Sequence, residues 1–242
     1  MPLSGKRILI TGAAVRVGRA MALAVAKAGG DVVVHYGHSE EEAKNLKETI
    51  DALGVDCTLV QADLSKPESA AEIIETIEQR GPLFALVNSA AIFEDLELKD
   101  TDLARWQQHL DINLTAPFML SKAFGEATER RKAEGRIINI LDWRALRPGA
   151  DHLPYTISKA GLAALTKSLA AAMAPAITVN GMALGAILPP KGEENASDVL
   201  ENVPAKRWAE VEEVGETLIF LLSGPSYITG EILYLDGGRH LI

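Results

Sequence analysis

The amino-acid sequence predicts an α/β domain built on a doubly wound parallel sheet of about seven strands, with helices on both faces. Short runs of β-branched and aliphatic residues alternate with longer helical patterns along all 242 residues, which is the rhythm of a parallel sheet. The apolar runs are not joined by hairpin turns, and no repeat or interdomain linker interrupts them. A chain of this length can bury a sizeable core in one domain, so residues 1–242 are expected to be a single domain.

Each expected element follows from a local pattern. The strands are the apolar runs at 6–11, 31–36, 56–61, 83–88, 136–142, 176–181 and 231–235. The helices are the periodic or Ala/Leu-rich stretches near 16–29, 40–53, 67–80, 102–131, 156–173 and 210–222. Residues 184–208 are rich in Pro, Gly, Asn and charge and lack regularity. Irregular segments of this length often cover a site, so we expect a substrate-binding loop here, with a variable surface loop as the alternative.

Composition narrows the classes of partner. The net charge of −9 disfavours nucleic acid or an anionic membrane surface as the main partner. The apolar run after Met1 is too short for a signal peptide, and no stretch approaches about 18 apolar residues, so a cytoplasmic protein is expected. Cys57 reads as a small buried hydrophobe, and the histidines show no metal-ligand spacing. The sequence has no Gly-x-Ser-x-Gly elbow, which disfavours a serine hydrolase.

The first strand-to-helix turn predicts a dinucleotide site. It reads Thr11-Gly-Ala-Ala-Val-Arg-Val-Gly18, between an apolar strand and a helix, which is the context that a phosphate-binding turn requires. Gly12 allows a tight turn, Gly18 allows close helix packing, and the helix N-terminus offers free N–H groups to phosphate. Arg16 would lie over that phosphate. A solvated helix cap is the alternative for Arg16.

Asp142, Tyr155 and Lys159 form the expected catalytic group. Asp142 ends an apolar strand, and Tyr155 and Lys159 begin a helical segment thirteen residues later. Residues four apart lie on one helix face. We therefore expect the Lys159 ammonium to lower the pKa of the Tyr155 phenol and to make it a usable proton donor or acceptor.

Together, the glycine turn and Tyr155-x-x-x-Lys159 resemble the short-chain dehydrogenase/reductase family over essentially the whole chain. In that family serine is usual at the position of Asp142. Aspartate there, with Arg16 in place of the middle glycine of the turn, resembles the pteridine reductase branch. The resemblance implies a Rossmann-type reductase, a homotetramer, and contacts of Arg16 with both cofactor phosphate and substrate.

The end of the second strand predicts NADPH as the cofactor. NAD sites place Asp or Glu about 20 residues beyond the glycine motif, but His35-Tyr36-Gly-His38-Ser39 contains no acid before Glu40. Imidazole and hydroxyl donors would suit a 2′-phosphate. This stretch resembles the His-Tyr-x-Arg-Ser segment of pteridine reductases, with His38 where arginine is usual. An ordinary polar strand exit is the alternative.

Further site residues are implied by the same resemblance. Asp63 would accept from the adenine amine, although a helix-capping aspartate is equally consistent with the sequence. Asn113 would hold a proton-relay water, or simply kink its helix. The resemblance assigns these residues to cofactor binding: Gly12, Arg16, Val17, Gly18, His35, Tyr36, His38, Ser39, Asp63, Leu64, Asn88, Ser89, Ala90, Tyr155, Lys159, Gly185 and Ile187.

The expected substrate is a pterin. Phe93 follows the fourth strand, where pteridine reductases use phenylalanine to sandwich a pterin against the nicotinamide; a core aromatic is the alternative. Arg16, Asp142 and Tyr155 would complete the substrate site. The C-terminal segment 235–242 resembles that of bacterial dihydromonapterin reductases, and such tails can reach a neighbouring subunit's site, which makes Arg239 a candidate contact.

The expected reaction is NADPH-dependent reduction of a pterin C=N bond, in dihydromonapterin, dihydrobiopterin or dihydrofolate. Tyr155 or Asp142, through water, would protonate the ring nitrogen, and Lys159 would hold the nicotinamide ribose. Two alternatives stay open. A carbonyl reductase of the 3-oxoacyl-acyl-carrier-protein type would prefer serine or threonine at position 142. A non-catalytic NADPH-binding sensor would not need Tyr155 and Lys159.

Overall fold

The computed structural model describes residues 1–189 and 197–242. Within them, seven strands form one sheet in the order β3-β2-β1-β4-β5-β6-β7, and every pairing is parallel. The strands are β1 (Arg7–Ile10), β2 (Asp31–Tyr36), β3 (Cys57–Gln61), β4 (Ala85–Asn88), β5 (Gly135–Asp142), β6 (Ile177–Leu184) and β7 (Ile232–Leu235). The predicted fold class is confirmed.

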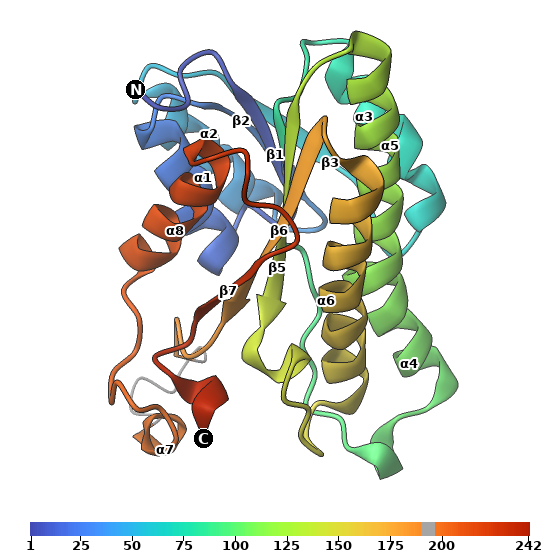
Figure 1. The fold of residues 1–242 in the computed structure, drawn as a ribbon, viewed down its shortest axis with the longest axis vertical. Coiled ribbons are helices and arrows are strands. Elements are labelled where there is room, and N and C mark those ends of the chain that lie inside the picture. The colour runs from blue at the N-terminus through green and yellow to red at the C-terminus, as the bar shows by residue number, and fades with distance from the viewer. Residues whose placement is uncertain (190–196) are drawn as a thin grey trace.

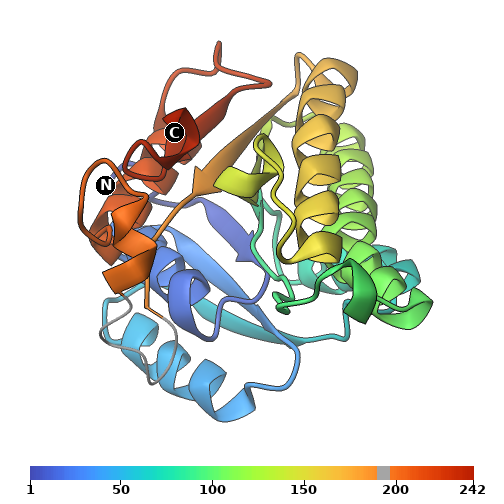
Figure 2. The same cartoon turned by 90° about the horizontal axis from the view of Figure 1, so that it is seen from below.

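Helices cover both faces of the sheet (Figures 1 and 2). They are α1 (Arg16–Lys27), α2 (Glu40–Asp51), α3 (Ala70–Glu78), α4 (Leu103–Leu110), α5 (Ala116–Arg131), α6 (Leu153–Met173), α7 (Ser197–Glu201) and α8 (Val211–Ser223). Successive strand residues point to opposite faces. Ile8 therefore packs in the core under α1, α2 and α8, whereas Leu9 packs in the core under α3, α5 and α6.

The expected helix at 102–131 is divided. It consists of α4, a π turn at Asp111–Thr115, and α5. Pro117 lacks the N–H that would donate to the carbonyl of Asn113 in a regular α-helix, and the wider π turn accommodates this defect. The expected helix at 67–80 likewise begins with a 3₁₀ turn at Pro67–Ser69.

The expected irregular segment 184–208 is only partly irregular. Residue 184 still belongs to β6, and α7 forms at Ser197–Glu201. Residues 190–196 lie outside the described part of the chain, so the expectation of a substrate-binding loop is not settled by the segments around them. None of the helices in the described ranges combines the length and apolar character needed to cross a bilayer.

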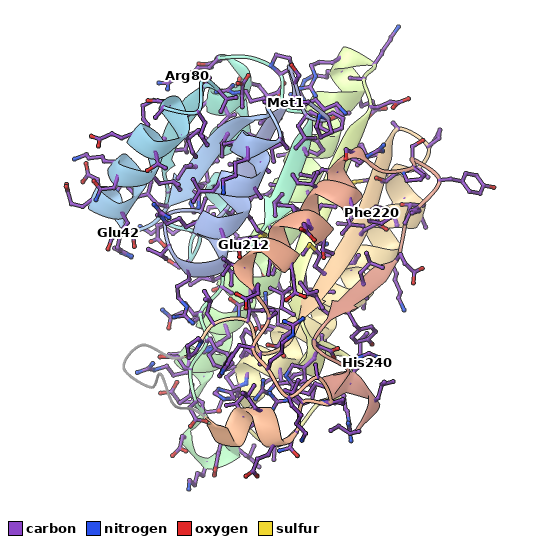
Figure 3. The ribbon with its side chains drawn as sticks, turned by 90° about the vertical axis from the view of Figure 1, so that its left-hand side faces the viewer. Met1, Glu42, Arg80, Glu212, Phe220 and His240 are labelled. Carbon is purple, nitrogen blue, oxygen red and sulfur yellow. The ribbon has the colours of Figure 1, made fainter. Side chains whose placement is uncertain are left out.

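The strand order predicts a ligand-binding edge at one end of the sheet. The chain proceeds outward from β1 to β2 and β3, and then returns to the other side of β1 to add β4. In open parallel sheets, ligands bind beyond the carboxyl ends of the strands at such a reversal. Figure 3 shows Met1 and Arg80 at the opposite, amino end, and His240 beyond the end of β7.

Candidate active site

The turn after β1 is fixed by Thr11 and two glycines. Thr11 Oγ1 accepts hydrogen bonds from the backbone N–H groups of Ser89 (2.9 Å) and Ala90 (3.0 Å), which ties the end of β1 to the end of β4. Gly12 has a φ of +64°, and a Cβ there would lie 2.9 Å from the Ala90 Cα. A Cβ on Gly18 would collide with the carbonyl of Gly12. Both glycines are therefore required by the packing of the turn itself.

Helix α1 presents its first turn to this end of the sheet. Val15 caps the helix without a side-chain hydrogen bond, and the first turn contains no acidic residue. Free N–H groups at a helix start suit an anion such as a phosphate. The exposed Arg16 lies beside them in a left-handed conformation, with Nη2 3.4 Å from the carbonyl oxygens of Leu188 and Pro189.

His35 braces the turn from within the protein. Its Nδ1 accepts the Gly12 N–H at 3.2 Å, which places the ring proton on Nε2, 3.2 Å from the Ala62 carbonyl oxygen. The ring is buried, and burial lowers its pKa to about 4. Both ring nitrogens thus have partners inside the protein. This corrects the expectation that the His35 imidazole donates to a 2′-phosphate, since its contact with the site is through Gly12.

His38 and Ser39 remain available at the predicted 2′-phosphate position. His38 is exposed, and Ser39 caps α2 without using its hydroxyl group in a side-chain cap. Asp63, expected at the adenine, accepts hydrogen bonds from the backbone N–H (3.0 Å) and hydroxyl (2.7 Å) of Ser65. These bonds lower the pKa of Asp63. They also agree with its alternative role in a capping turn.

Several residues assigned to the cofactor belong to the core. The side chains of Tyr36, Leu64 and Ile187 are buried in hydrophobic clusters, so any contact with a ligand there would come mainly from their backbones. Val17 also packs against the core. Gly185 lies where a Cβ would be 2.6 Å from the Asp236 Cα, so close approach to the end of β7 requires glycine.

Asn88 contributes an unpaired acceptor at the end of β4. Its Nδ2 donates to Asn139 Oδ1 (2.8 Å) and to Ser121 Oγ (3.2 Å). Its buried Oδ1 has no hydrogen-bond partner among the described residues. Because buried acceptors are usually satisfied, this oxygen is suited to accept from a bound group at the carboxyl edge.

Asp142, Tyr155 and Lys159 converge beyond β5. The Tyr155 hydroxyl donates to Asp142 Oδ2 at 3.2 Å, and Asp142 Oδ1 accepts the backbone N–H of Arg144 at 2.8 Å. Lys159 Nζ lies 5.7 Å from the centre of the Tyr155 ring and donates to the Ile140 carbonyl at 2.7 Å. The predicted constellation is therefore assembled around the Tyr155 hydroxyl.

The electrostatics of this group differ from the sequence expectation. Burial, followed by the charge of Asp142 and the hydrogen bond to it, raises the pKa of Tyr155 well above its ordinary value. Burial lowers the pKa of Lys159 to about 8. The expectation that Lys159 lowers the pKa of Tyr155 is wrong for this structure, because the carboxylate and burial dominate. Tyr155 is a phenol that carries a proton to donate.

Asn113 lies in the π turn, with its side chain fully buried. Its Oδ1 accepts from the Ile92 N–H (2.9 Å), while its Nδ2 donates to the Ile92 carbonyl (3.0 Å) and to Ser158 Oγ (3.1 Å). The amide thus positions the segment before Phe93. The role of Asn113 in holding a relay water stays a prediction.

Phe93 is 55% exposed, so it is not the core aromatic that the sequence allowed. Its ring stacks on His152, with centroids 4.1 Å apart at 20°, and meets Tyr155 edge-on at 4.7 Å. His152 also lies 2.9 Å, through Nδ1, from the carbonyl of Glu94. The structure therefore places Phe93 beside the Tyr155 ring, with its own ring accessible.

Three side chains in this site were not assigned from sequence. They are Thr11, Arg144 and His152. Thr11 directly precedes the glycine turn, and His152 precedes Tyr155 by three residues. Their closeness in sequence to these motifs could have marked them as site residues. Their contacts, however, link segments tens of residues apart, which periodicity does not reveal. No group of three His, Cys, Asp or Glu side chains with metal-ligand geometry occurs in residues 1–189 and 197–242.

Comparisons with known proteins place the chain in a family. Residues 12–240 match the family described as Enoyl-(Acyl carrier protein) reductase. A 3-oxoacyl-[acyl-carrier-protein] reductase from Synechocystis sp. is 35% identical, with 98% of this chain and 97% of the relative covered. The chain belongs to the short-chain dehydrogenase/reductase family.

Its relatives within that family differ in substrate. A 2-dehydro-3-deoxy-D-gluconate 5-dehydrogenase from Bacillus subtilis is 34% identical over 98% of this chain and 95% of the relative. The crystal structure of FolM Alternative dihydrofolate reductase 1 from Brucella canis, complexed with NADP, superposes with a TM-score of 0.92 at 31% identity, covering 100% of this chain and 97% of that chain. This short-chain dehydrogenase/reductase is thus an oxidoreductase whose substrate must be argued from its own site.

Proposed function

We propose that this short-chain dehydrogenase/reductase uses NADPH to reduce a C=N bond of a dihydropterin. The observation that carries the proposal is the hydrogen bond from the Tyr155 hydroxyl to the Asp142 carboxylate, where the family resemblance expects serine. When bound, NADPH supplies the hydride. Tyr155 then supplies the proton for the ring nitrogen, and Asp142 orients the phenol and exchanges protons with it.

A carboxylate beside the donor suits C=N better than C=O reduction. Reducing a ketone develops negative charge on oxygen, which a carboxylate repels and a neutral hydroxyl stabilises. Reducing a dihydropterin leaves a protonated ring nitrogen, so no oxyanion faces Asp142. The half-exposed Phe93 ring adds a stacking surface for a flat heterocycle beside Tyr155. The likeness to the Brucella dihydrofolate reductase supports the same reading.

The residues at the end of the sheet fit NADPH. The first turn of α1 offers N–H groups without a competing side-chain cap, and Ser39 offers a hydroxyl at the position of the 2′-phosphate. Lys159 lies beside Tyr155, where it would meet the nicotinamide ribose. The NADP complex of the Brucella relative supports this choice of cofactor. We further propose a homotetramer, as the family resemblance implies, which light scattering would test.

A 3-oxoacyl-[acyl-carrier-protein] reductase is the second candidate. The Synechocystis relative, at 35% identity, favours it. Asp142 argues against this candidate, because its carboxylate would repel the negative charge that develops on a ketone oxygen during reduction.

Rates of NADPH oxidation with dihydropterins, ketones and acyl thioesters test the proposal. We expect turnover of dihydropterins by the unaltered protein, loss of that turnover in Asp142→Ser, and a gain of weak ketone reduction in the same variant. Phe93→Ala should weaken dihydropterin binding by roughly 1–3 kcal/mol, the range for stacking a base on an aromatic side chain. Vigorous acyl-thioester reduction without dihydropterin turnover would replace this assignment by the second candidate.

A further inference from the structure

Arg144 connects the Asp142 carboxylate to the start of the helix that carries Tyr155. Its backbone N–H donates to Asp142 Oδ1 at 2.8 Å, and its guanidinium Nη1 lies 3.7 Å from the same oxygen. Asp142 Oδ2 is left to accept from the Tyr155 hydroxyl at 3.2 Å. The two oxygens of the carboxylate therefore have separate partners: Arg144 contacts one, and Tyr155 contacts the other.

The Arg144 guanidinium is itself held from two sides. Its Nη2 and Nε lie 2.8 Å and 3.3 Å from Asp151 Oδ2, and its central carbon lies 4.9 Å from the centre of the Trp143 ring. Only 14% of the side chain is exposed. A planar guanidinium with contacts in several directions is held in one orientation. Arg144 can therefore fix the position of Asp142 as well as contact it.

The contact with Asp151 links two elements of the fold. Asp151 lies two residues before α6 begins at Leu153, and Tyr155 is in the first turn of that helix. Asp142 is the last residue of β5. A single guanidinium therefore ties the end of β5 to the start of α6. The separation of these two segments determines the distance between the Tyr155 hydroxyl and the Asp142 carboxylate.

Arg144 also supplies the positive charge nearest to Asp142. In the part of the chain that the structure describes, no other lysine, arginine or histidine nitrogen lies within 4.0 Å of the Asp142 carboxylate. Lys159 Nζ donates instead to a backbone carbonyl of β5. Burial and the charge of Asp142 raise the pKa of Tyr155, and the charge of Arg144 opposes them. The influence expected of Lys159 thus comes from Arg144.

We propose that Arg144 is a positioning residue, which holds the Asp142 carboxylate so that its Oδ2 keeps the Tyr155 hydroxyl in one orientation. The proposal rests on the proposed function for the substrate that this hydroxyl serves. A role in stability alone explains less, because an ion pair with the half-exposed Asp151 contributes little to folding.

Kinetics of Arg144 variants test this role. Arg144→Gln should lower kcat with a dihydropterin by about 10- to 100-fold, the cost of a misplaced catalytic group, and should change the KM for NADPH by less than about threefold. Arg144→Lys keeps the charge but cannot make both contacts with Asp151, so its kcat should fall between. Arg147→Gln, at an exposed arginine of the same segment, is the matched control and should keep kcat within about twofold.

A double-mutant cycle tests whether Arg144 acts together with Asp151. Asp151→Ala should also lower kcat, because it releases the guanidinium. The double variant that combines Arg144→Gln with Asp151→Ala should be no slower than Arg144→Gln alone, as expected of residues in one network. Losses that multiply in the double variant would overturn the proposal, because the two residues would then act independently.

A spectroscopic measurement separates this proposal from the proposed function. In protein labelled with ¹³C at the tyrosine Cζ atoms, the signal that disappears in Tyr155→Phe belongs to Tyr155. Arg144→Gln should shift this signal in the NADP-loaded protein, whereas Arg147→Gln should leave it in place. A shift without dihydropterin turnover would keep the positioning role and remove the proposed function. An unchanged Tyr155 signal in Arg144→Gln would overturn the positioning role, whether or not dihydropterins are reduced.

Discussion

Tyr155 is the residue to which we assign the proton donor of the proposed reaction. It is buried, its pKa is raised, and it donates to Asp142. Such a phenol carries its proton at neutral pH. The proton is therefore available for transfer to the substrate. In the proposed mechanism Asp142 orients the phenol and exchanges protons with it, whereas the sequence suggested that Lys159 would lower the pKa of Tyr155.

Replacing Tyr155 with Phe tests this assignment. The change removes one hydroxyl and little volume, so turnover should fall at least about 100-fold, the lower range for general acid–base catalysis. The NADPH dissociation constant, measured by fluorescence titration, should stay within about threefold because the ring remains. Retention of most activity would make Asp142 the donor.

The buried ammonium of Lys159 should lower the stability of the fold although the proposed reaction requires it. Its folded pKa of about 8, against 10.5 ordinarily, means that burial disfavours the ammonium by about 3 kcal/mol at neutral pH. Lys159→Met removes this cost but also the bond to the Ile140 carbonyl, worth about 1 kcal/mol. In urea unfolding at pH 7 without cofactor, we expect Lys159→Met to be about 1–2 kcal/mol more stable than the unaltered protein. In assays with cofactor the same variant should be inactive.

The pH dependence supplies the control. Because the folded pKa is below the unfolded one, the unaltered protein should gain stability as pH rises from about 8 to 10.5. Lys159→Met should lack that gain. A variant less stable than the parent at pH 7 would show that the ammonium is better solvated in solution than in this structure.

At the scale of elements, the strands were the most predictable feature. Fully buried parallel strands read as continuous apolar runs, and β2 was predicted with the observed bounds. The break between α4 and α5 was not predicted, because helical periodicity continues through it; the spacing of Asn113 and Pro117 was the available signal. The contact of His35 with Gly12 joins two strands, and nothing local encodes it. The roles assigned to the site residues stay predictions. The structure adds only that these residues lie close together.

The link between β2 and the glycine turn gives a pH prediction. The folded pKa of His35 is about 4 and its ordinary value is 6.5, so between these values the unfolded chain binds more protons. Stability is therefore complete above about pH 6.5 and falls as pH drops towards 4, by about 3 kcal/mol from this group. Urea unfolding at pH 7, 5.5 and 4.5 should show the fall, and His35→Gln should flatten it. An equal slope in both proteins would exclude His35 as its source.

At the scale of the whole molecule, the candidate cofactor site joins the two halves of the sheet. The turn after β1, the end of β2 and the end of β4 meet where the strand order reverses. The candidate catalytic group of Asp142, Tyr155 and Lys159 and the glycine turn after β1 lie on different elements, which a single bound dinucleotide would connect. A dinucleotide that binds only the folded chain should therefore stabilise the whole fold against unfolding.

Thermal unfolding measures that stabilisation and the selectivity together. A ligand at about 100 times its dissociation constant adds about 2.7 kcal/mol, which corresponds to a Tm increase of roughly 5–10 °C for a chain of this size. NADPH should raise Tm more than the same concentration of NADH, because no acid precedes Glu40 after β2 and the Ser39 hydroxyl and Arg16 can face a phosphate. In Ser39→Asp the carboxylate repels the 2′-phosphate and accepts from the ribose hydroxyls, so the order should reverse. An equal Tm increase with both cofactors in the unaltered protein would contradict the NADPH assignment, while the dihydropterin assays would remain a separate test of the substrate.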